Sequence, residues 1–305
     1  VADFHVLTDS VRGATKYLQS DVTDLSVTNA ESLKSFDSDG FTVGTMNEVN
    51  TNTEDYVSWN WKMGTTSGIT TNVSTTITPS AYSFSTTAGQ SAIKYAGNDT
   101  AGAKIAHGLG ATPQMIIVKN LETTNNWSVF HVSTGNTKSF QINSDAAVRT
   151  GDYFNDTDPD SVNFCVSDNI ETNEDYDYIA YCFAPVQGFS KFGVYTGNGN
   201  ADGPFIYLGF RPNLFIVKST GTNSWFAFSD PLHTNGYFGG NRIYLNENNV
   251  ESTNGNVYEI KEFLSNGVKI ASSHGGANTS GQDYIYMAFA KAPLVNSNGV
   301  PCNAR

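Results

Sequence analysis

Residues 36–62 read FDSDGFTVGTMNEVNTNTEDYVSWNWK, and the chain repeats the plan of this stretch twice. Each copy opens with a short apolar run, continues through an Asn/Thr-rich passage and closes with an aromatic run. The other two copies are residues 164–184, FCVSDNIETNEDYDYIAYCFA, and residues 263–290, FLSNGVKIASSHGGANTSGQDYIYMAFA. An internal repeat has to be identified before single elements, because each copy is one structural unit of the fold.

A second repeated phrase lies between these copies. Residues 107–132 read HGLGATPQMIIVKNLETTNNWSVFHV, and residues 208–230 read LGFRPNLFIVKSTGTNSWFAFSD. The alignment pairs Pro113 with Pro212, Lys119 with Lys218, and Trp127 with Trp225. A full unit therefore runs for about 100 residues, from a Tyr-Gly-Asn opening through the IIVK or FIVK strand to the aromatic close.

The repeat predicts four segments. Residues 1–62 are a half unit that corresponds to the back half of a full unit, and residues 63–92 are a Thr/Ser-rich connection or a β-structured excursion. Residues 93–187 are the first full unit, and residues 188–305 are the second full unit with a C-terminal tail. We expect the half unit either to belong to something longer or to pair with other material.

The residue pattern predicts an all-β fold. Charged residues are only 15% of the chain, and 28 glycines are distributed among many short apolar runs. Such runs, separated by turn residues at short intervals, are typical of antiparallel sandwiches. We therefore expect tandem antiparallel β-sandwich repeats, jelly-roll-like, with very little helix. The fully apolar run at residues 115–118 should form a core strand, and Asp39-Gly40 should be the turn of a hairpin between Phe36 and Phe41. Residues 56–61 should form a strand with large rings on one face, and residues 28–35 a short capped helix.

The charge balance limits the classes of partner. A net charge of −12 disfavours binding to nucleic acid, whose phosphates carry the same sign. No apolar run approaches the roughly 20 residues of a spanning helix, so we expect no membrane insertion. The sequence has three cysteines, at positions 165, 182 and 302. We interpret them as small apolar side chains that are buried, and the alternative left open is a disulfide bond between Cys165 and Cys182.

The sequence offers only one weak metal candidate. Asp156, Asp158 and Asp160 alternate as calcium ligands do, but the positions where an EF-hand requires Gly and Glu hold Ser161 and Ser167. A solvated turn is the competing interpretation. The five histidines lack the spacing of metal ligands and are interpreted as structural: His5, His107, His131, His233 and His274.

No catalytic residues or cofactor are predicted. An acidic cluster at Glu171, Glu174 and Asp175 recurs in the other copies as Glu54, Asp55 and Asp283. A feature carried by every repeat favours architecture over catalysis, because active sites are usually single. The aromatic pair Trp59 and Trp61 could stack on sugar rings, so we single it out as a speculative glycan contact. Trp127 and Trp225 recur at one repeat position and are interpreted as core anchors.

Several phrases resemble known virion proteins. These are HGLGATPQMIIVKN followed by a Trp strand, FDSDGF, the YVSWNWK-type endings, GFRP at 209–212, and FSKFGVYTGNGNADGPFIYLGF at 189–210. They resemble repeat domains of tail-fibre-like and other structural proteins of marine bacteriophages, cyanophages especially. The likeness covers nearly the whole chain except about residues 63–92.

The resemblance implies a non-enzymatic part of the virion, on the particle surface, that contacts other virion proteins. It also implies a homo-oligomer, for which a trimer is the expectation, and contact with host-surface glycans. The alternatives are a capsid decoration protein and a carbohydrate-binding module or lectin. A polysaccharide depolymerase is disfavoured because no unique acidic cluster is evident.

Overall fold

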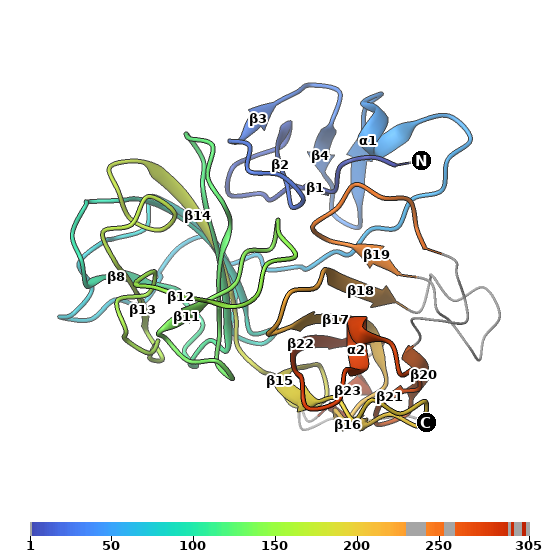
Figure 1. Cartoon of the computed structure of the whole chain (residues 1–305). Coiled ribbons are helices and arrows are strands. Elements are labelled where there is room, and N and C mark those ends of the chain that lie inside the picture. The colour runs from blue at the N-terminus through green and yellow to red at the C-terminus, as the bar shows by residue number, and fades with distance from the viewer. Residues whose placement is uncertain (1, 230–241, 253–259, 292–293, 296–300, 303–305) are drawn as a thin grey trace. The chain divides into compact units, whose positions relative to one another are not determined.

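The computed structural model describes residues 2–229, 242–252, 260–291, 294–295 and 301–302. The chain forms two compact domains (Figure 1). Domain 1 consists of residues 1–143 and 149–184, and domain 2 consists of residues 144–148 and 185–305. The half unit is therefore part of domain 1, and a short segment within the first full unit belongs to domain 2.

Domain 1 is a β-sandwich with a five-stranded and a two-stranded antiparallel sheet. The large sheet has the order β10-β9-β14-β7-β6 and comprises β6 (Ala81–Ser85), β7 (Gln90–Ala96), β9 (Met115–Asn120), β10 (Ser128–His131) and β14 (Asp177–Phe183). The small sheet pairs β8 (Ala103–Ala106) with β13 (Asn163–Val166). A hairpin of β11 (Lys138–Ser139) and β12 (Arg149–Thr150) lies between β10 and β13 in the chain.

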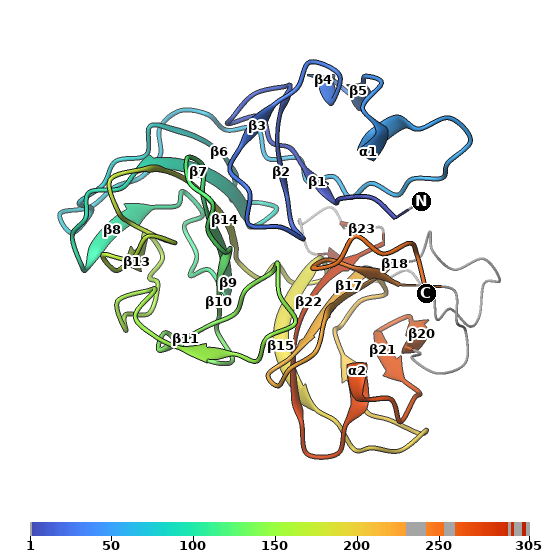
Figure 2. The same ribbon diagram turned by 45° about the horizontal axis from the view of Figure 1, so that its top comes forward.

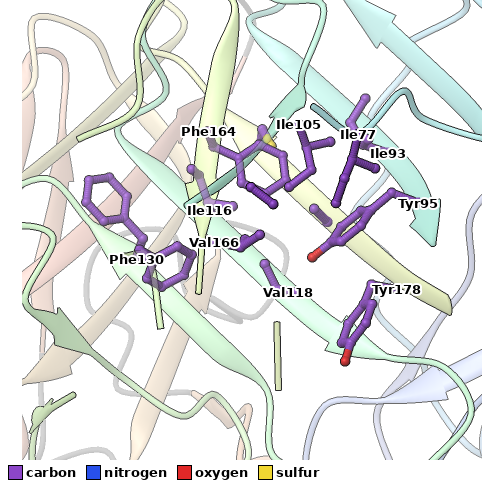
Figure 3. Close-up of a cluster of buried hydrophobic side chains, with 14 of the residues drawn as sticks. Ile77, Ile93, Tyr95, Ile105, Ile116, Val118, Phe130, Phe164, Val166 and Tyr178 are labelled. Atoms are coloured by element: carbon purple, nitrogen blue, oxygen red, sulfur yellow. The ribbon is translucent and has the colours of Figure 1, made fainter. Parts of the chain in front are cut away.

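The core of domain 1 lies between these two sheets (Figure 3). Alternate residues of β7, such as Ile93 and Tyr95, contribute to it because side chains of a strand point to opposite faces in turn. The small sheet contributes Ile105 and Phe164, and the apolar run of β9 contributes Ile116 and Val118. The predicted core strand at 115–118 is confirmed, since all six residues of β9 are buried.

Domain 2 repeats this topology. Its large sheet has the order β15-β22-β17-β18-β19 and comprises β15 (Ser190–Thr196), β17 (Pro212–Ser219), β18 (Trp225–Ser229), β19 (Ile243–Tyr244) and β22 (Asp283–Ala290). The second sheet comprises β16 (Phe205–Tyr207), β20 (Ile260–Leu264) and β21 (Gly267–Ile270). Helix α2 (Gly275–Asn278) precedes β22, and β23 (Leu294–Val295) pairs with β24 (Pro301–Cys302).

Four strands of the large sheets match in order, since β10, β9, β14 and β7 of domain 1 correspond to β18, β17, β22 and β15 of domain 2. The closing aromatic strands β14 and β22 each lie between the strand with the Tyr-Gly-Asn opening and the IIVK or FIVK strand. Trp127 and Trp225 are both fully buried, and the backbone N–H of each donates to an asparagine Oδ1, on Asn143 and Asn246 respectively. The prediction of an all-β fold built from antiparallel sandwiches is confirmed.

The half unit has a smaller structure of its own. It contains β1 (Val6–Leu7), β2 (Lys16–Gln19), β3 (Val27–Thr28), β4 (Leu33–Phe36), β5 (Phe41–Val43) and helix α1 (Asn47–Asn50). Figure 2 shows the β4–β5 hairpin beside α1. Two buried contacts attach the half unit to the large sheet of domain 1: the indole N–H of Trp127 donates to the Gln19 carbonyl, and the Tyr181 hydroxyl donates to Asp9.

Two local predictions for the half unit are wrong. Residues 28–35 do not form a helix, because Val27–Thr28 and Leu33–Phe36 are strands with partners of their own. Residues 56–61 do not form a strand. Their counterparts β14 and β22 are held between two neighbouring strands, and the part of the chain that the structure describes supplies no such neighbours here. A strand needs a ladder partner for its backbone polar groups.

Other sequence features have definite places. Within the Thr/Ser-rich segment 63–92, residues Ala81–Ser85 form the edge strand of the large sheet, and Ile77 bridges to Ile105. Cys165 and Cys182 are buried free thiols, which agrees with the interpretation as small apolar side chains. The side chain of Cys302 lies outside the described residues. No helix in the described ranges is long and apolar enough to cross a membrane.

The glycine of the Tyr-Gly-Asn opening should be essential to each sandwich. A Cβ at Gly97 would lie 1.9 Å from the Glu174 carbonyl oxygen, and one at Gly197 would lie 2.3 Å from that of Thr279. We expect Gly97→Ala and Gly197→Ala each to lower the free energy of unfolding by about 2–3 kcal/mol, since backbone must shift. Chemical denaturation measures this. Gly40→Ala, where a Cβ meets nothing within 4 Å, is the matched control, and an equal loss there would contradict the argument.

Candidate functional site: the tyrosine turn and the aromatic segment after it

Each full unit contains a turn that is closed by the hydroxyl of a tyrosine. Tyr178 Oη accepts from the backbone N–H of Glu174 at 2.9 Å and donates to the carbonyl of Ile170 at 2.9 Å. Tyr284 Oη accepts from Thr279 N–H at 2.9 Å and donates to the Gly275 carbonyl at 2.6 Å. We call residues 170–178 and 275–284 the tyrosine turns. Both tyrosine rings are fully buried, so their hydroxyls need these partners.

A second tyrosine stacks on each of these rings. Tyr95 lies 5.3 Å from the ring of Tyr178, and Tyr195 lies 5.1 Å from that of Tyr284. Burial raises the pKa of Tyr95 and of Tyr195 well above the ordinary value, so both phenols stay neutral and donate hydrogen bonds. The tyrosine turn and the Tyr-Gly-Asn opening are thus two halves of one buried site.

The half unit contains a third tyrosine turn, at residues 47–56. Tyr56 Oη accepts from Thr51 N–H at 2.8 Å and donates to the Asn47 carbonyl at 2.6 Å. Asn50 donates to the Gly44 carbonyl at 2.7 Å, as Asn278 donates to that of Ser272. The two hydrogen bonds of the tyrosine hydroxyl occur in all three copies, but Tyr56 is 48% exposed, whereas Tyr178 and Tyr284 are 0% exposed.

The aromatic segment after Tyr56 holds the two tryptophans that the sequence singled out. Trp61 packs edge-on against Phe183, with ring centroids 6.3 Å apart. The indole N–H of Trp59 is buried and finds no acceptor among the described residues. Both side chains are half-buried. One edge of each ring therefore serves packing, and the exposed remainder is the area that a ligand could contact.

The carboxylates proposed for calcium are all exposed, and two of them accept hydrogen bonds. Asp160 Oδ1 accepts from the backbone N–H groups of Val162 and Asn163 at 2.7 Å each, and Asp158 accepts from Asn136. Across the described residues, no three His, Cys, Asp or Glu side chains gather to hold a metal ion. His107 contacts the Asp160 carbonyl, and burial lowers its pKa. His233 lies outside the described residues.

Sequence reasoning missed a buried ion pair at Glu171. Arg149 donates to both carboxylate oxygens, and the Ser128 hydroxyl donates to Oε2 at 2.5 Å. The Arg149 guanidinium also lies 3.9 Å from the ring centre of Tyr153. Burial alone would raise the pKa of Glu171, but the hydrogen bonds from Arg149 and Ser128 outweigh it and lower that pKa. The carboxylate stays ionised as part of the scaffold.

This ion pair is not a repeated feature. When the turn asparagines Asn173 and Asn278 are aligned, Gly276 in domain 2 holds the position that Glu171 holds in domain 1. From sequence, Glu171 was grouped with Glu174 and Asp175. A residue-by-residue alignment of the turns could have shown that Glu171 does not belong with them. Arg149 lies in a short strand far from Glu171 in the chain and carried no comparable signal.

Comparison with protein families adds one finding. A model of the family described as Domain of unknown function (DUF7483) matches residues 1–293. The chain belongs to the DUF7483 family. A single family model therefore spans the half unit and both full units. No curated protein and no solved structure matches this DUF7483 chain.

The DUF7483 chain also buries one lysine in each full unit, at the aligned positions Lys119 and Lys218. Lys119 Nζ donates to the Asn120 carbonyl at 2.9 Å. Lys218 Nζ lies 2.9–3.3 Å from four backbone carbonyls, those of Asp145, Ala146, Ser219 and Gly221. These carbonyls replace the water that an ammonium group loses on burial. Lys218 thus connects residues 145–146 to the turn after β17, whereas Lys119 bonds to the residue that follows it.

The tyrosine turns should differ in their contribution to stability. We expect Tyr178→Phe and Tyr284→Phe each to lower the free energy of unfolding by about 1–2 kcal/mol, because each leaves a buried N–H and C=O unpaired. Tyr56→Phe makes the same chemical change at an exposed site and should cost less than about 0.5 kcal/mol. Equilibrium urea unfolding measures the three losses. Equal losses at all three positions would contradict the role of burial.

Lys218 should make stability depend on pH. Burial lowers its pKa from 10.5 to about 8. Between these values the unfolded chain binds the proton and the folded chain does not, so stability rises with pH. From pH 7.5 to 9.5 the wild type should gain about 1–2 kcal/mol relative to Lys218→Met, measured by urea unfolding at each pH. Lys16→Met, at an exposed position, should leave the profile unchanged. Parallel profiles for wild type and Lys218→Met would refute the assignment.

Proposed function

We propose that this DUF7483 chain is a structural protein of a bacteriophage virion, a tail-fibre or appendage component that contacts the host surface. One observation carries the proposal. The polar side chains buried at aligned positions of both full units make the same internal bonds, as Tyr178 and Tyr284 or Asn173 and Asn278 do. Repeated polar groups that serve construction support a building element, and the proposal assigns no catalytic role and no cofactor.

The surface chemistry supports the same role. The chain carries only 15% charged residues and a net charge of −12, and it is rich in Thr, Asn, Ser and Gly. Contacts made by such a surface depend little on Coulomb attraction, so they tolerate changes in salt. The negative charge also keeps the protein away from nucleic acid. We propose that its partners are other virion proteins and further copies of itself, as a homo-oligomer with a trimer as the first expectation.

The half-buried pair Trp59 and Trp61 is the proposed contact for host glycans, because aromatic faces bind sugar rings by stacking. Two exposed aromatic side chains in the second full unit, Phe205 and Tyr207, add area of the same kind. A capsid decoration protein functions without contact to glycans, whereas glycan contact is the whole function of a lectin. The position of the protein on the particle therefore separates these alternatives.

Immunogold electron microscopy of the phage that encodes the chain tests the proposal. We expect antibodies against the purified protein to label tails or appendages. Label on the capsid would favour the decoration protein, and unlabelled particles would refute a virion role. In a glycan array, Trp59→Ala should abolish glycan binding with an unchanged melting temperature if this side chain is the contact. Tyr82→Ala, at a half-buried ring elsewhere in domain 1, is the matched control.

A further inference from the structure

The Tyr-Gly-Asn opening of each full unit completes the tyrosine turn of that unit. The stacked tyrosine of the opening donates to a carbonyl of the turn: Tyr95 to Thr172 at 2.6 Å, and Tyr195 to Ala277 at 2.8 Å. One residue separates this tyrosine from the glycine, so the motif is Tyr-X-Gly-Asn. The glycine N–H donates to the turn as well, and its missing Cβ allows the two backbones to approach closely.

The asparagine of the motif forms a reciprocal pair with the asparagine of the turn. Asn98 N–H donates to Asn173 Oδ1 at 3.1 Å, and Asn173 Nδ2 donates back to Asn98 Oδ1 at 3.0 Å. Domain 2 repeats the pair with Asn198 and Asn278, at 2.7 and 3.0 Å. The strand that follows the motif, β8 or β16, then pairs with the edge of β13 or β21. One segment therefore fills a tyrosine turn and a strand edge together.

The half unit has the receiving groups without the segment that fills them. Tyr56, Asn50 and Val49 hold the positions of Tyr178, Asn173 and Thr172. In the described ranges, neither the Val49 carbonyl nor Asn50 Oδ1 accepts a hydrogen bond. Among the rings that the structure describes, none stacks on Tyr56, which is 48% exposed.

The strand edge next to this turn is also open. β5 occupies the position of β13 and β21, and among the described residues it pairs with β4 alone. Phe41 on β5 is 40% exposed. An exposed edge with an apolar side chain is the type of surface that accepts an added strand.

We propose that the half unit is an acceptor for a β-strand with the pattern Tyr-X-Gly-Asn that is not part of residues 1–305. Its tyrosine stacks on Tyr56 and donates to the Val49 carbonyl, and its asparagine pairs with Asn50. The following residues extend the β4–β5 hairpin by one strand. The two matching strands of this chain are not free to fill the site, because β7 lies between β14 and β6 and β15 is paired along its whole length with β22. This inference does not depend on the function proposed above.

A labelled peptide with the sequence of residues 90–106, QSAIKYAGNDTAGAKIA, provides the test, because it carries the motif and the strand after it. We expect saturable binding to the full chain in fluorescence anisotropy. Peptides with Tyr95→Ala or Gly97→Val should bind about tenfold more weakly or worse, since they lose a stacked ring or gain a clash. Absence of saturable binding, or equal binding of the altered peptides, would overturn the proposal.

Variants of the full chain locate the site. Tyr56→Ala and Asn50→Ala should weaken peptide binding by about tenfold. Tyr207→Ala, which removes a more exposed tyrosine from domain 2, should not change it. Hydrogen exchange of the wild-type chain provides the test if Tyr56→Ala fails to fold. Bound peptide should slow the exchange of the backbone amides of residues 41–54. Protection of β7 or β14 instead would show strand exchange within domain 1 and overturn the assignment.

Sedimentation of the chain alone tests the source of the strand. A strand from outside residues 1–305 predicts that the sedimentation mass of this chain is unaffected by Tyr56→Ala. Self-association that Tyr56→Ala abolishes would show that a second copy supplies the strand, and it would overturn this part of the proposal.

Discussion

The fold depends on completing the hydrogen bonds of polar groups that its sandwiches bury. Each full unit places a tyrosine hydroxyl, an asparagine amide and a lysine ammonium inside, at Tyr178, Asn173 and Lys119 in domain 1. A buried polar group without a partner costs about 1–3 kcal/mol, so each of these positions demands a specific neighbour. The Tyr-X-Gly-Asn strand is the neighbour that meets this demand for the asparagine, and its tyrosine ring stacks on the ring of the turn tyrosine. This requirement is why the opening and the close of a unit recur together.

The half unit shows what remains when that strand is missing. Its tyrosine turn forms, because the bonds of Tyr56 to Thr51 and Asn47 connect residues close together in the chain. Its aromatic close does not become a strand, because a strand depends on partners distant in sequence. All three aromatic endings therefore follow a tyrosine turn, but only two of them, β14 and β22, form sheet strands. The same local sequence is compatible with a buried site and with an open one.

The interpretation of repeated residues as architecture held for Trp127 and Trp225, which are fully buried. It failed to distinguish Glu171, which is buried in an ion pair with Arg149 in domain 1 alone. The carboxylates at Asp156, Asp158 and Asp160 illustrate a related limit, since alternation in sequence did not gather them into a cage. Spacing along the chain indicates on which face of a strand a side chain lies. A binding site also requires residues from other strands, which spacing does not indicate.

The sequence alone determined the repeat, the β-class of the fold, the core strand at 115–118 and the hairpin at Asp39-Gly40, where Phe36 pairs with Phe41. These features rest on local preferences and on periodicity, which neighbouring residues carry. Only the tertiary structure decided that residues 56–61 are not a strand, that Arg149 pairs with Glu171, and that Tyr56 is exposed while Tyr178 is buried. Each of these depends on which distant segments pack together, and no local pattern contains that information.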